Sequence, residues 1–91
     1  MGAMVYTVRF REYTFGGLRQ RTIAVAGTAL RGTATEQRAG GWGWFLRYPH
    51  GELAGEGYPA TWEGVLEEIR AALMMEAKYG RLSYLPRDVT S

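Results

Sequence analysis

Few residues of this 91-residue chain have side chains suited to catalysis. His50 is the only histidine, and Glu52 is the one carboxylate close to it in sequence. A catalytic histidine needs an orienting partner and a substrate, whereas a Pro-His-Gly segment favours a polar middle residue for the sake of the turn alone. We therefore predict that His50 is a turn residue.

The acidic residues do not have the spacing of a catalytic pair or a metal site. Glu52 and Glu56 share one face of a predicted strand but lie about 13 Å apart along it. Glu63 and Glu67 are like charges on an exposed helix face. There is no cysteine, no loop has the carboxylate pattern of a calcium site, and residues 40–43 lack the lysine and hydroxyl of a phosphate-binding loop. The sequence predicts a protein that is not an enzyme and that has no metal or cofactor.

Arginines occur in both of the first two strand segments, and the first segment also has aromatic residues. Arg9, Arg11 and Tyr13 fall on one face of the first segment, and Arg19 and Arg21 share a face of the second. Arginines that bind phosphates beside aromatics that stack on bases are typical of single-stranded nucleic-acid binders. Lysine is nearly absent and the RRM ribonucleoprotein motif is missing, so we keep nucleic-acid binding by these five residues as the alternative function.

A second surface is apolar and lies near the C-terminus. Its predicted members are Met74, Met75, Leu82, Tyr84 and Leu85. Methionine adapts to irregular partners, and an apolar tail beside it indicates docking of a protein or of a second copy. The other interpretation is that the tail folds back and covers Met74 within one molecule. The first predicted function is therefore protein–protein interaction with homodimerisation.

Charge is divided unevenly along the chain. Residues 1–47 have seven arginines against two glutamates, a net +5, and residues 48–91 have four basic against seven acidic residues, a net −3. Three interpretations remain: a sheet that binds a polyanion, head-to-tail pairing of copies, or two solvated faces.

Hydrophobic periodicity divides the chain into strands followed by one helix. Period-two alternation predicts strands over residues 4–13, 18–26, 42–48 and 52–58, with residues 30–38 as an edge strand or an ordered loop. Apolar residues at helical spacing begin after Thr61, the predicted N-cap, and end at Gly80. Residues 81–85 form a short final strand or a packed strap. We predict an α+β fold: an antiparallel sheet of four to five strands with one C-terminal helix packed on one face, a two-layer sandwich.

Size and composition predict one domain over residues 1–91. Residues 1–3 are interpreted as a cloning remnant and residues 86–91 as a frayed tail. Hydrophobic residues make up 46% and charged residues 22% of the chain, as in globular proteins. No apolar run approaches the ~18 residues of a membrane span, and no secretory signal is present. The prediction is a cytoplasmic protein without membrane contact.

Three segments resemble HicB-type antitoxin domains. They are the strand Val5-Tyr6-Thr7-Val8-Arg9-Phe10, the step Tyr48-Pro49, and the helix start Trp62-Glu63-Gly64-Val65-Leu66. Those domains open on a similar strand, pass a Phe-Pro step and enter a helix of pattern T-x-E-E-A-L. The resemblance covers half of the chain. The chain differs by a longer β region between Gly16 and Gly41, by Gly64 in place of an acidic residue, and by the lack of a DNA-binding extension. The resemblance implies a small noncatalytic domain that binds a partner protein.

Overall fold

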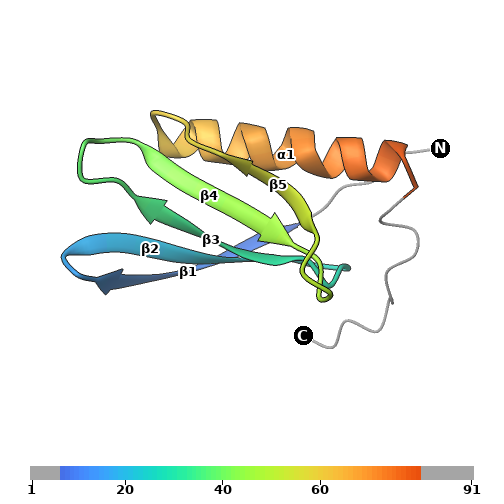
Figure 1. The fold of residues 1–91 in the computed structure, drawn as a ribbon, viewed down its shortest axis with the longest axis horizontal. Helices are drawn as coiled ribbons and strands as arrows, with labels where there is room; N and C mark the ends of the chain where they lie inside the picture. The colour runs from blue at the N-terminus through green and yellow to red at the C-terminus, as the bar shows by residue number, and fades with distance from the viewer. Residues whose placement is uncertain (1–6, 81–91) are drawn as a thin grey trace.

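The computed structural model describes residues 7–80 and has five strands followed by one helix (Figure 1). The strands form one antiparallel sheet in which the spatial order is the chain order, β1-β2-β3-β4-β5. The helix α1 lies along one face of this sheet, close to β5 and β4. The elements are β1 Val8–Phe15, β2 Leu18–Val25, β3 Arg31–Glu36, β4 Trp42–Arg47, β5 Leu53–Gly57 and α1 Trp62–Lys78. The predicted two-layer α+β fold is confirmed.

Glycine pairs turn the chain between strands. Gly16 and Gly17 have φ values of 62° and 79°, a left-handed conformation that a two-residue hairpin needs and that glycine adopts without strain. The hairpin is in register from Val8 opposite Val25 to Phe15 opposite Leu18. The turn end of the β1–β2 hairpin extends past the part of the sheet that α1 covers (Figure 1).

The segment predicted as an edge strand or a loop is the central strand of the sheet. β3 pairs with β2 on one side and with β4 on the other. Its small residues allow this: Ala34 is buried, and at Gly32 even a methyl group would overlap the backbone of Phe45. The edge-strand prediction was wrong because the threonines of β3 face the uncovered side of the sheet, where polar residues are normal in antiparallel sheets.

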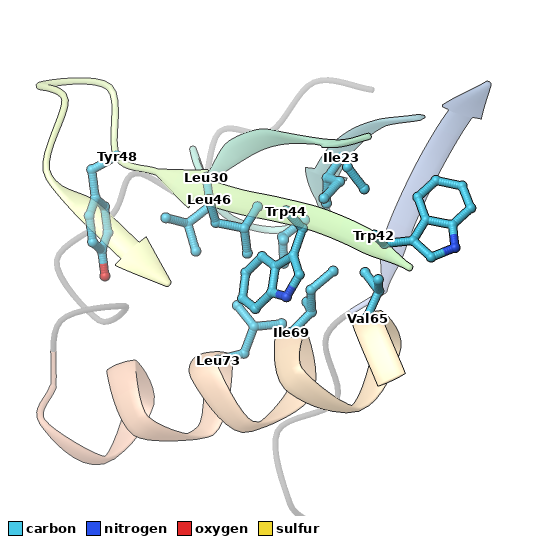
Figure 2. Close-up of a cluster of buried hydrophobic side chains, with 11 residues drawn as sticks. Ile23, Leu30, Trp42, Trp44, Leu46, Tyr48, Val65, Ile69 and Leu73 are labelled. Atoms are coloured by element: carbon cyan, nitrogen blue, oxygen red, sulfur yellow. The ribbon is translucent and has the colours of Figure 1, made fainter. Parts of the chain in front are cut away.

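The core lies between α1 and the sheet face that carries the tryptophans of β4. Figure 2 shows Trp44, Leu46, Ile69 and Leu73 between these two layers, and each is at most 4% exposed. Glycines of β5 make room for Trp44, because a Cβ at Gly55 would lie 3.0 Å from its ring. The large aromatic side chain of Trp44 therefore packs where β5 has glycines.

Both predicted ends of the helix are confirmed. The Thr61 hydroxyl accepts a hydrogen bond from the Gly64 amide at 3.0 Å, which satisfies a free amide of the first turn. Gly80 follows the last turn with a φ of 75°, as is common after a helix. The buried carboxylate of Glu76 was not predicted, and it accepts a hydrogen bond of 2.7 Å from the Tyr48 hydroxyl.

No helix in the described part of the chain has the length and apolar character of a transmembrane span. The predictions for residues 1–3 and 81–91 lie outside the described residues.

Candidate nucleic-acid interface

The sheet face opposite α1, here called the open face, carries a row of arginines across four strands. Arg9 of β1 pairs with Ala24 of β2, Ala24 pairs with Arg31 of β3, and Arg31 pairs with Arg47 of β4. Residues that pair directly across strands point to the same face. Because neighbouring strands lie about 4.8 Å apart, the row spans about 14 Å. All three arginines are exposed, so this row is a band of positive charge.

The second row of the open face joins charge to an aromatic ring. It runs from Arg11 through Thr22 and Thr33 to Phe45, which pairs with Glu56. Phe45 is 38% exposed, and the guanidinium of Arg47 lies 5.5 Å from its ring centre. The open face thus has four arginines against the single carboxylate of Glu56 among the described residues.

These four arginines are not neutralised by carboxylates. Within residues 7–80 the ion pairs involve other side chains. Two of the four arginines are oriented by main-chain oxygens instead: Arg31 donates from Nη1 to the carbonyl of Leu30 at 2.7 Å, and Arg47 donates from Nη1 to the carbonyl of Gly51 at 2.9 Å. A guanidinium has five N–H donors. Both groups therefore keep donors for an anion in solution.

Aromatic rings lie at the end of the open face away from the arginine row. Tyr13 is 42% exposed, and its hydroxyl donates to the Gln20 side chain at 2.7 Å. Tyr58 is 80% exposed and lies over Gly43, where a Cβ would be 3.1 Å from its ring. A side chain at residue 43 would displace this ring. The absence of a side chain at Gly43 therefore lets the exposed tyrosine lie close to the sheet.

Two shallow depressions mark the ends of β4 on this face. One, of about 480 Å³, lies between the Arg31 and Arg47 side chains and reaches Phe45 and Pro49. The other, also about 480 Å³, lies beside Tyr58. Both are open to solvent, so they suit flat groups that lie on a surface better than a small molecule that must be enclosed.

The remaining two arginines of the predicted site lie on the opposite face of the sheet. Arg19 donates to Glu36 at 2.8 Å and Arg21 donates to Glu12 at 2.7 Å. The hydrogen bond and the positive charge of Arg19 lower the pKa of Glu36 below its ordinary value. The Arg21 guanidinium also lies 4.1 Å from the Trp62 ring centre, a cation–π contact that closes the end of the core.

The structure therefore divides the predicted nucleic-acid site in two. It places Arg9, Arg11 and Tyr13 on the open face and Arg19 and Arg21 on the other. The sequence reasoning missed four members of the open face: Arg31, Thr33, Phe45 and Arg47. A signal was present in the sequence, because the polar residues 31, 33 and 35 alternate with the small residues Gly32 and Ala34, of which Ala34 is buried, but it was obscured by the polarity of the segment.

The predicted partner surface is described only in part. Met74 is 66% exposed and Met75 is 52% exposed on α1, as the interpretation as a docking surface requires. Leu82, Tyr84 and Leu85 lie outside the described residues, so the choice between docking and a covering tail stays open.

His50 lies in the turn between β4 and β5. The carbonyl of Tyr48 accepts a hydrogen bond of 2.8 Å from the Gly51 amide, which closes the turn around Pro49 and His50. The imidazole stacks on the Tyr48 ring and has Nε2 3.1 Å from a Glu52 carboxylate oxygen. The side chains of His50 and Glu52 are both exposed, and neither residue lines either of the two depressions. Residues 7–80 contain no cluster of His, Asp and Glu arranged to bind a metal.

No family model, curated protein or solved structure matches the chain. The resemblance to HicB-type antitoxin domains therefore stays a prediction.

Proposed function

We propose that this protein is a noncatalytic binding module whose open sheet face binds single-stranded nucleic acid. The observation that carries the proposal is the set of four arginines on that face, none of them paired with a carboxylate in residues 7–80. Holding positive charges side by side costs free energy in the folded protein, as for Arg31 directly opposite Arg47. A polyanion removes that cost when it binds.

The aromatic residues favour a single strand over a duplex. Bases of a single strand are free to stack on side chains, and each such contact is worth about 1–3 kcal/mol. Phe45 lies beside Arg47, and Tyr58 lies at the far end of β4. A strand that runs along β4 would meet phosphate-binding and base-stacking groups in turn. A rigid duplex would reach the arginine row but would not present its bases to the tyrosine.

The first experiment is a salt titration of binding to random RNA and DNA oligonucleotides, measured by fluorescence anisotropy. Four phosphate contacts predict a slope of about −3 for log K against log salt on a single strand. A double-stranded arm of the same sequence tests the preference for single strands. Absence of binding at about 50 mM salt would end the proposal, since a phosphate-driven interaction is strongest at low salt.

Variants assign the binding to the open face. The double substitution Arg31→Ala and Arg47→Ala removes two charges, and at about 50 mM salt we expect affinity to fall about 60-fold and the slope to decrease by about 1.4. Arg70→Ala is the control for net charge, because Arg70 is an exposed arginine of α1; it removes one charge, and the double variant removes two. If Arg70→Ala lowers log K by half as much as the double variant does, net charge alone attracts the ligand. If the double variant binds with an unchanged slope, Arg31 and Arg47 do not contact the phosphates and the binding lies elsewhere.

A further inference from the structure

The outward side of α1 carries a line of side chains that is apolar in its middle and charged at each end, and the exposed Arg70 borders this line. Glu67, Ala71, Met74 and Lys78 follow one another at spacings of four, three and four residues, and all are exposed. Side chains with this spacing form one line along a helix. We call this line, together with Met75 beside it, the outer stripe. A groove of about 580 Å³ lies along its apolar part.

The middle of the outer stripe has the shape of a helix-packing surface. Met74 and Met75 expose 66% and 52% of their surface, and Ala71 is small enough for a second helix to approach closely. Large and small residues that alternate along a stripe allow side chains of one helix to enter the gaps of another. This surface is separate from the open face, since α1 and the open face lie on opposite sides of the sheet.

The charges at the two ends identify the partner. Glu67 is near the N-terminal end of the stripe and Lys78 is near its C-terminal end. A second copy of the same helix, placed antiparallel, brings Glu67 of each copy to Lys78 of the other. A parallel copy would instead bring like charges together at both ends. We infer that two copies of this chain pair through the outer stripes of α1 in antiparallel orientation, with Ala71 of each copy against Met74 of the other.

The predicted interface is small. One pair of helices buries less than the roughly 800 Å² per partner of a standard interface, so we expect a dissociation constant of about 10–500 µM. The pairing is isologous, because each copy contributes the same surface, and it stops at a dimer. It does not depend on nucleic-acid binding.

Sedimentation velocity between about 5 and 500 µM tests the pairing with charge-reversed variants. Glu67→Lys and Lys78→Glu, each alone, place like charges at both ends of the pair, and we expect the dimer to weaken about tenfold or more. An equimolar mixture of the two variants restores opposite charges at both ends and should form a heterodimer. The double variant E67K/K78E should recover the homodimer for the same reason. Arg38→Glu, in the β3–β4 loop, is the control for a change of net charge.

Each outcome decides the inference. Recovery in both the mixture and the double variant supports it, provided that circular dichroism shows folded proteins. A wild-type protein that is monomeric at 500 µM overturns the inference. The outer stripe would then bind residues 81–91 or a different protein. A dimer that none of these substitutions changes also overturns it, because the contact then lies elsewhere.

Discussion

Gly32 is the residue of the sheet that tolerates a side chain least. It lies in the middle of β3, opposite Leu46 of β4. A Cβ at this position would overlap the carbonyl oxygen of Phe45 and lie 2.8 Å from its carbonyl carbon. Both atoms are backbone and cannot rotate away. Gly32→Ala therefore requires β3 and β4 to separate locally, and the hydrogen bonds between these two strands lengthen beyond their usual range.

The expected cost follows from the groups affected. Overpacking of a well-packed site costs about 1–3 kcal/mol, and each buried backbone group that loses its partner adds about 1–3 kcal/mol. We expect a loss of roughly 3–5 kcal/mol in the free energy of unfolding. For a domain of this size the melting temperature then falls by more than about 12 °C. The measurement is thermal and urea unfolding followed by circular dichroism.

Gly43→Ala is the matched control. Gly43 is also a strand glycine, but a Cβ there would meet the ends of two side chains, Gln37 Nε2 at 2.9 Å and Tyr58 Cε1 at 3.1 Å. These groups can rotate away, so we expect a change within about 1 kcal/mol. If Gly32→Ala melts within a few degrees of the wild type, or if both variants lose the same stability, the argument from backbone overlap is wrong.

Three further predictions concern the helix cap, the ion pair and the exposed tyrosine. Thr61→Ala leaves a first-turn amide without its acceptor and should lower the free energy of unfolding by about 1 kcal/mol in chemical denaturation. Thr61→Asp still offers an acceptor to that amide and should retain most of the wild-type stability. Arg19→Ala removes the cause of the low Glu36 pKa, so the carboxyl should titrate at higher pH in an NMR titration. Because that pKa is lowered in the folded protein, the pair stabilises the fold above the unfolded pKa, and this contribution is lost as the pH falls through the folded value. Tyr58→Ala should weaken oligonucleotide binding about 5- to 150-fold without a change of the salt slope, because it removes stacking and no charge.

Each of these predictions has a contradicting result. Equal stability of the two Thr61 variants would mean that the hydroxyl does not act as a cap. A Glu36 carboxyl that titrates alike with and without Arg19 would remove the ion pair as the cause of its pKa. A Tyr58 variant with a smaller salt slope would show that its effect comes through neighbouring phosphate contacts.

The sequence predicted the parts of the fold that local patterns determine. Alternation in residues 18–26 placed Arg19 and Arg21 on one face of a strand, and in β2 they do share a face, the one that also holds the buried Ile23 and Val25. These two arginines therefore lie on the sheet face that packs against α1, and the Arg21 guanidinium covers the end of the core at Trp62. The helix limits followed from a threonine and a glycine, whose conformations are local properties.

The candidate site was harder to predict because it depends on strand order. Alternation along one strand shows that Arg9 and Arg11 share a face. It does not show that Arg31 of β3 and Arg47 of β4 lie on that same face of the sheet. β3 was missed as a central strand because its open-face side chains are polar. Glu76 was missed because its burial depends on the Tyr48 hydroxyl, which lies far away in sequence.

The agreement between strand order and chain order has a consequence for how the protein folds. Each strand pairs with the one that precedes it in the chain, so the sheet needs no long loop closure before contacts form, and such topologies fold comparatively fast. The contact of Phe10 with Trp62 is different, because it joins β1 to the start of α1 at a ring-centre distance of 4.8 Å. During synthesis each strand can pair with the strand before it as soon as it leaves the ribosome. The side of β1 that carries Phe10 stays uncovered until α1 has also been synthesised. We therefore expect a chain that ends before residue 62 to have an ordered hairpin and an uncovered apolar surface.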